Sequence, residues 1–152
     1  MILTTQKDIN LDDDYVNIKY RELTPTIHKV IQLCGGLSSV LLCEKDNIMY
    51  KVDINDVLYI EAVDRKSCVY TNDEVYIIQT PLSQLEEILA ELYFVRISKM
   101  ALANIFKIKS ISDGLHYRLT AEMVNGEKVV ISRHYHGALL DSIQKLAKEM
   151  MT

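Results

Sequence analysis

The feature that most constrains the fold of this chain is a succession of short apolar runs between residues 38 and 135, separated by polar turns. The clearest runs cover residues 40–42, 48–52, 57–60, 67–70 and 74–79. Short runs rich in β-branched and aromatic residues are typical of strands, whereas an amphipathic helix shows a longer period of 3.6 residues. We therefore predict a mostly β fold of small antiparallel sheets with a few peripheral helices.

Two turn signals predict hairpins in this region. Asn72-Asp73 separates two apolar runs, and Asn125-Gly126 separates two alternating ones. Asn-Gly is the strongest short-range hairpin signal, because both residues tolerate a positive φ. A two-residue loop at Asn125-Gly126 would place Arg133 on the same sheet face as Arg118 and Thr120. A slip of one residue would reverse that facing.

Three other segments carry a helical pattern. Thr24-Pro25 and Thr80-Pro81 each offer a capping hydroxyl followed by a proline suited to the first helical turn. Residues 137–151 show an apolar stripe at helical spacing. Residues 15–20 alternate and predict one further strand near the N-terminus.

The charge of the chain is segregated along its length. The net charge is −4, yet residues 37–94 carry 4 basic and 11 acidic side chains, while residues 95–136 carry 7 basic and 3 acidic ones. A local basic surface can meet phosphates even when the total charge is negative. A solvated surface with chance clustering gives the same numbers, so charge alone does not decide between the two.

The sequence indicates a cytoplasmic chain without catalytic or metal chemistry. It has no apolar run of about 20 residues and no basic, then apolar, N-terminal signal. Its three cysteines lack a C-x-x-C spacing, and no phosphate loop or nucleophile motif occurs. His134-x-His136 could put two imidazoles on one strand face, but no nearby carboxylate or cysteine completes a ligand set. We expect no metal, no cofactor and no small-molecule substrate.

A conventional recognition helix is also missing. The helix predicted after Pro81 carries Glu86, Glu87 and Glu91 and no basic residue, so phosphates would repel it. A DNA-binding chain of this kind would have to use loops and strand ends. Three segments combine cations with small polar donors, the mixture that phosphate and base-edge contacts need: residues 64–67, 96–99 and 132–135.

These segments, in this order, resemble the LytTR DNA-binding family. The resemblance covers about residues 46–146 and rests on residues 57–61, 82–89, 94–99, Asn104, 125–127 and 131–135. It implies an elongated arrangement of small β-sheets that reads DNA by inserting loops into successive major grooves. It also implies direct-repeat sites occupied by two copies. Met100 and Ala103 depart from the residues usual at those positions.

The resemblance implies a set of contact residues. The first loop corresponds to Arg65, Lys66 and Ser67, the second to Ser98 and Lys99, and the third to Arg133 and His134. Lys99 and Arg133 take the central roles, because arginine can bridge guanine O6 and N7 and lysine can serve a base or a phosphate. Asn104 and Tyr135 correspond to framework positions.

The sequence predicts two parts, a short strand–helix extension at residues 1–45 and the DNA-binding domain at residues 46–152. A phosphorylatable receiver, which many family members carry, needs about 120 residues and does not fit into the first part. A short extension without a receiver resembles a stand-alone branch of the family, in which a membrane protein often restrains the regulator. Apolar stripes at residues 27–34 and 139–150 favour a homodimer on DNA, although either stripe could pack on its own sheet. The alternative function is a β-rich module that docks a protein partner through its helices and acidic middle.

Overall fold

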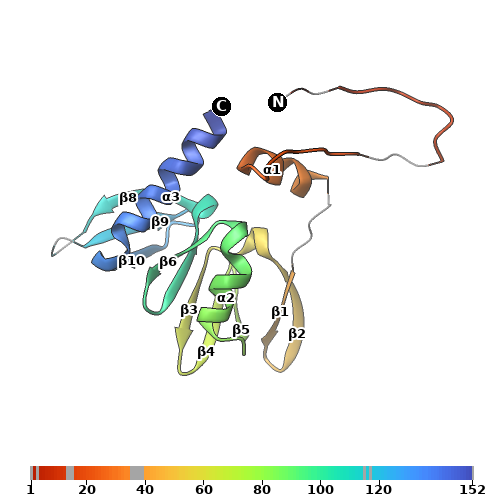
Figure 1. Ribbon diagram of the computed structural model, residues 1–152. Helices are drawn as coiled ribbons and strands as arrows, with labels where there is room; N and C mark the ends of the chain where they lie inside the picture. The colour runs from red at the N-terminus through yellow and green to blue at the C-terminus, as the bar shows by residue number, and fades with distance from the viewer. Residues whose placement is uncertain are drawn as a thin grey trace. The chain divides into compact units, whose positions relative to one another are not determined.

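The computed structural model describes residues 2, 4–12, 16–34, 40–114, 116 and 118–151 (Figure 1). The chain divides after Leu37 into two compact units, residues 1–37 and 38–152. Among its described residues the first unit has one helix, α1 (Pro25–Leu33). It begins as predicted, with Thr24 Oγ1 accepting a hydrogen bond from the Ile27 amide at 3.3 Å. No described helix is long and apolar enough to cross a lipid bilayer.

The second unit is mostly β, as the apolar runs predicted. Seven antiparallel strands form one sheet in the order β2-β1-β5-β4-β3-β7-β6. Three form another in the order β10-β9-β8. The strands of the first sheet are β1 (Val40–Lys45), β2 (Ile48–Asp53), β3 (Tyr59–Val63), β4 (Lys66–Tyr70), β5 (Val75–Ile78), β6 (Phe94–Ser98) and β7 (Ala101–Asn104). Those of the second are β8 (Ile108–Asp113), β9 (Leu119–Met123) and β10 (Lys128–Ile131).

The described part of this unit also contains the longer helices α2 (Leu82–Leu89) and α3 (Arg133–Met151) and the short 3-10 helices η1 (Ile54–Asp56), η2 (Ala90–Leu92) and η3 (Ile105–Lys107). Helix α2 lies over one face of the large sheet (Figure 1). It begins one residue later than Thr80-Pro81 predicts. Pro81 occupies the cap position, and its carbonyl accepts from the Leu85 amide at 3.0 Å.

Strand β7 separates two hydrophobic cores. All four of its residues are buried, and alternate side chains enter opposite cores. Leu102 packs with α2, whereas Ala101 and Ala103 pack with the small sheet and with Leu139 of α3. Small alanine side chains let the second layer approach the sheet closely. Burial, with Glu127 of the β9–β10 turn nearby, raises the pKa of Tyr59 on β3.

Both predicted hairpins are present, but the second has a different loop. Glu122 pairs with Lys128, and the Met123 amide donates to the Glu127 carbonyl at 2.8 Å, so three residues lie in the loop instead of two. Gly126 has φ +89°, the left-handed conformation that closes such a loop.

Three other expectations need correction. The N-terminal strand is absent from its described part, since residues 16–20 are irregular and have no ladder partner. The third helix begins at Arg133 and not at residue 137, so the predicted facing of Arg133 with Arg118 and Thr120 on a sheet does not apply. Strand β1, which the sequence placed in the N-terminal extension, pairs with β2 and β5 of the large sheet.

Candidate nucleic-acid interface

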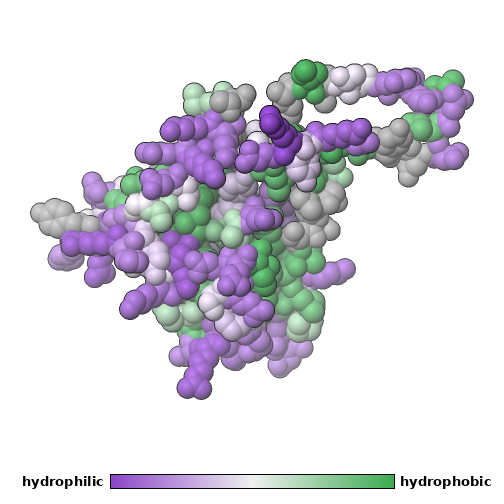
Figure 2. All heavy atoms as spheres, in the orientation of Figure 1, coloured by the Kyte–Doolittle hydropathy of each residue, from purple (hydrophilic) through white to green (hydrophobic). Residues whose placement is uncertain are grey.

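The first predicted contact segment is the tight turn between β3 and β4. Val63 pairs with Lys66, and Asp64 and Arg65 have φ of 48° and 66°. Positive φ at both central positions defines the hairpin turn that matches strand twist. Arginine adopts this backbone at some energetic cost, and residues held in such conformations cluster at functional sites. Arg65 and Lys66 are exposed, and hydrophilic side chains gather at this tip in the space-filling view (Figure 2).

Ser67 differs from its two neighbours. Its side chain is only 1% exposed, and its Oγ donates to the Thr80 carbonyl at 2.8 Å. The hydroxyl therefore holds β4 against the segment that leads into α2. The predicted DNA contact of Ser67 is therefore corrected, because its hydroxyl is buried and already donates within the fold.

The second segment is the turn between β6 and β7. Ser98 Oγ accepts from the Met100 amide at 3.2 Å, and Lys99 is exposed at the tip. Arg96 braces this turn from the strand: its Nη1 donates to the Lys99 carbonyl at 3.2 Å, and its Nε lies 3.2 Å from Oε2 of Glu86 on α2. Sequence reasoning grouped Arg96 with the contact loop, whereas the structure gives it a positioning role.

The third segment is the first turn of α3. Arg133 and His134 are exposed there, with no acidic residue in the turn. The Ser132 amide just before it donates to the Ile97 carbonyl of β6 at 2.9 Å. A helix N-terminus presents free amide groups and a positive dipole end, both of which favour a phosphate. Arg133 thus belongs to a helix start and not to the end of a strand, because β10 ends at Ile131.

The three segments lie at one end of the large sheet. Glu61 pairs with Ala101, and the Ala62 amide donates to the Met100 carbonyl at 2.7 Å, so the β3–β4 and β6–β7 turns are neighbours. The β6–β7 turn and the start of α3 line a common hollow of about 440 Å³, formed by Ser98, Lys99, Met100, Ser132, His134 and Tyr135. Residues far apart in the sequence therefore form one continuous surface.

The charges at the two ends of the large sheet are opposite. Arg65, Lys66, Lys99 and Arg133 take part in none of the three ion pairs found in the described part of the chain. The β4–β5 turn lies at the other end of β4. There a hollow of about 340 Å³ carries Asp53, Asp56, Asp73 and Glu74, with Lys51 as its one basic side chain. Acidic side chains thus gather at the end of the large sheet opposite to the turn that carries Arg65 and Lys66.

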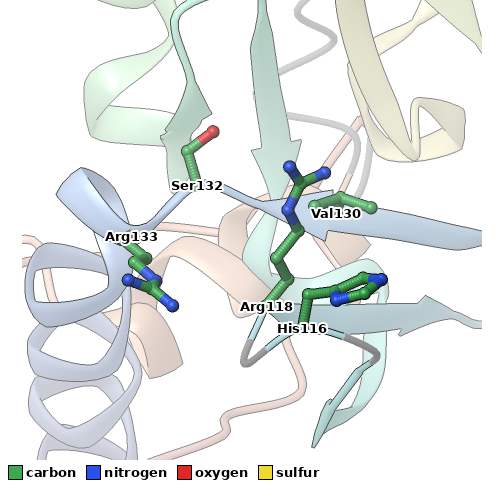
Figure 3. A pocket seen from close by; sticks show the side chains of 5 residues that line it. All are labelled: His116, Arg118, Val130, Ser132 and Arg133. Carbon is green, nitrogen blue, oxygen red and sulfur yellow. The ribbon is translucent and has the colours of Figure 1, made fainter.

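Sequence reasoning missed a second cationic hollow beside the contact surface. It has a volume of about 440 Å³ and is lined by His116, Arg118, Val130, Ser132 and Arg133 (Figure 3). Arg118 immediately precedes β9, and Arg133 begins α3, so only the antiparallel pairing of β9 with β10 brings them together. The sequence had grouped Arg118 and Arg133 on one sheet face, whereas the structure places both beside a hollow, with Arg133 at the start of a helix.

The histidine pair His134-x-His136 lies on a helix in the structure. His134 and His136 are two residues apart on a helix and not on a strand, so they do not share a face. His136 Nε2 lies 2.9 Å from the Ile131 carbonyl. Among the described residues no group of three or more His, Cys, Asp or Glu side chains could hold a metal ion. Burial raises the pKa of the Cys43 thiol to about 11 and also raises that of Cys68.

The family follows from the match of residues 47–144 to the model of the LytTr DNA-binding domain. The chain belongs to the LytTR family. The solved LytTr DNA-binding domain of a Bacillus cereus protein, described as a methyl-accepting/DNA response regulator, has the same fold. It is 26% identical, superposes with a TM-score of 0.65, and the match covers 69% of this chain and 96% of that domain.

The chain is also similar in sequence to proteins described as sensory transduction protein LytT. The Bacillus anthracis protein is 30% identical over 78% of this chain and 44% of its own length. The Bacillus cereus protein is 34% identical over 55% of this chain and 34% of its own length. The LytTR chain described here therefore spans less than half of the length of these relatives.

Proposed function

We propose that this LytTR chain is a cytoplasmic transcription regulator that binds double-stranded DNA in a sequence-specific manner. Its contact residues are Arg65 and Lys66, Ser98 and Lys99, and Arg133 and His134. The observation that carries the proposal is the gathering of three cationic segments, from separate parts of the chain, at one end of the large sheet. Two of the segments are hairpin turns and the third is the first turn of α3, and such narrow ends of elements can enter a major groove.

The three segments divide the work of binding. Arg65 and Lys66 on the strained turn, and the amide groups at the start of α3, suit phosphate oxygens. Arg133 and Lys99 suit base edges, because their exposed side chains project from segments fixed by backbone hydrogen bonds. A bidentate arginine–guanine contact contributes roughly 1–3 kcal/mol of discrimination.

We further propose that two copies occupy a direct-repeat site, with the tips of each copy in successive major grooves. A membrane protein that restrains the regulator is a second proposed partner. Both proposals rest on the resemblance to the family. Selection of bound sequences from random duplexes would give the site and the spacing of its repeats together. Sedimentation with the selected duplex would give the number of copies, and a single copy on the full site would contradict the pairwise arrangement.

The sharpest test divides specific from random binding by means of Arg133→Ala. This variant should weaken binding to the selected site by about 1–3 kcal/mol and leave binding to random duplex nearly unchanged. Arg133 is exposed at a helix N-terminus, where a positive charge does not stabilise the helix. The melting temperature of the Arg133→Ala variant should therefore not fall.

Lys109→Ala is the matched control. Lys109 is exposed on β8, 3.7 Å from Glu122, at the end of the small sheet that lies away from Arg133. Its loss should change binding to selected and random duplexes alike, with the salt slope reduced by one unit at most. If Arg133→Ala weakens both duplexes equally, Arg133 contacts a phosphate and does not read a base.

A further inference from the structure

The cationic hollow in Figure 3 lies beside the proposed contact tips and includes two residues that the proposed contacts do not. Arg118 and His116 come from the segment before β9, whereas Ser132 and Arg133 come from the start of α3. None of the five lining residues is a carboxylate, and the ion pairs within the described residues involve neither arginine. Two arginines therefore line one open hollow, and no carboxylate is among its five lining residues.

The backbone holds Arg118 in this position. The Gly114 amide donates to the Arg118 carbonyl at 2.5 Å, which closes the β8–β9 hairpin just before Leu119 pairs with Asp113. A Cβ on Gly114 would lie 2.9 Å from that carbonyl oxygen and 2.7 Å from Thr120 Oγ1. Only glycine permits this approach, so the hairpin end is fixed. On its other side, Leu119 pairs with Ile131, which places Arg118 across from Ser132.

The chemistry of the hollow matches a phosphate group. Arginine offers a planar fork of donors that binds phosphate oxygens bidentately, and Ser132 adds a hydroxyl donor. The hollow adjoins the first turn of α3, whose amide groups add to the positive potential. All five lining side chains are exposed. An exposed site of this kind holds a lone ion weakly, whereas a duplex adds the free energy of counterion release at many phosphates.

We infer that this hollow binds one backbone phosphate of the DNA duplex, and that Arg118 is a phosphate-contacting residue that sets the register of Arg133 over the bases. The inference rests on the proposed function. It assigns the two arginines of one hollow to different tasks: Arg118 contributes affinity without sequence preference, and Arg133 contributes sequence preference. Phosphate contacts fix the position of a protein on the duplex, and base contacts can form only once that position is fixed.

The test measures binding of the full chain to its selected duplex and to random duplex over a range of salt concentrations. Arg118→Gln should weaken both by about three- to tenfold near 0.1 M salt and reduce the salt slope by about one unit. Lys128→Gln removes the same charge from the opposite end of the small sheet, where Lys128 pairs in register with Glu122, and should leave the slope unchanged. Arg118→Lys should restore most of the slope, and melting curves of all variants check the fold.

A second measurement identifies the phosphate itself. Neutral methylphosphonates are placed singly along the selected duplex. One position should weaken binding by the wild-type chain and have no further effect on Arg118→Gln, because the charge pair is then already lost. If every position that weakens the wild type weakens Arg118→Gln equally, Arg118 contacts no phosphate and the inference is wrong.

The remaining outcomes separate the two proposals. Unchanged affinity and slope in Arg118→Gln overturn the inference and leave the proposed function standing. A loss confined to the selected duplex shows that Arg118 reads a base, which also overturns it. A wild-type chain that binds random and selected duplexes equally contradicts the proposed function, while a normal loss of slope in Arg118→Gln would still support the hollow. A wild-type chain that binds no duplex contradicts both.

Discussion

Replacing Asn104 tests how much a buried side-chain hydrogen bond contributes to the stability of the large sheet. Its side chain is 4% exposed at the end of β7. Nδ2 donates to the Val57 carbonyl at 2.9 Å, and Oδ1 accepts from the Phe106 amide at 3.1 Å, which caps η3. Asn104→Ala would remove both bonds and leave the carbonyl of the fully buried Val57 without its side-chain donor.

The expected loss of stability follows from these two bonds. An amide left without its cap in a partly exposed position costs about 0.5–1 kcal/mol. A carbonyl that loses its partner in a buried position costs about 1–3 kcal/mol. Asn104→Ala should therefore lower the free energy of unfolding by roughly 1.5–4 kcal/mol. For a chain of this length, that lowers the melting temperature by roughly 5–15 °C.

Asn125→Ala is the matched control, because Asn125 makes only the first kind of bond. Its Oδ1 also accepts from the amide two residues on, that of Glu127, at 3.1 Å, but the side chain is exposed. Urea unfolding of both variants should show unchanged m-values and a difference of about 1–3 kcal/mol between them. If Asn104→Ala loses no more stability than Asn125→Ala, the buried bond to Val57 contributes nothing net and the reasoning fails.

Two further predictions concern the contact turn and alkaline pH. Arg96→Leu removes the hydrogen bond to the Lys99 carbonyl and should weaken DNA binding in titrations by about three- to tenfold. Glu86→Gln keeps the hydrogen bond between Arg96 and the Lys99 carbonyl and should not weaken binding. Equal losses in the two variants would show that this hydrogen bond does not matter for binding. Because burial raises the pKa of Cys43 to about 11, its contribution to stability is complete below pH 9 and is lost as the pH rises towards 11. Cys43 should therefore contribute a fall in unfolding free energy of about 1.4 kcal/mol per pH unit in that window, in addition to the contributions of Cys68 and Tyr59, whose pKa values burial also raises. Cys43→Val should make the slope shallower by that amount, and identical slopes would contradict this assignment.

Local sequence signals predicted the local structure well. Thr24 caps its helix, Asn72-Asp73 turns a hairpin, and the apolar runs became strands. These features depend on a few adjacent residues, so their causes can be read from the sequence. The family resemblance then added the order of the contact loops, which composition and periodicity alone do not contain.

The sequence could not predict features that depend on pairing over long distances. The pairing of β1 with β5, and of β3 with β7, depends on packing between separate segments and has no local signal. The three-residue loop at Gly126 shifted a register by one, and that shift changed which residues lie opposite each other. For this reason the burial of Ser67 and the hollow beside Arg118 became visible only in the folded chain.

The acidic hollow at the far end of the large sheet has a consequence for the rate at which the chain finds DNA. Strand β4, with five residues, separates that end from the contact tips by about 17 Å. At physiological salt the screening length is about 8 Å, so the acidic end exerts little force on a duplex that meets the tips. At 0.01 M salt the screening length is about 30 Å, so both the basic tips and the acidic end act on the duplex. Lowering the salt should thus accelerate association of this chain, with its net charge of −4, less than that of a uniformly basic protein. At low salt, the repulsion between the acidic end and the phosphates favours encounters in which the tips face the duplex.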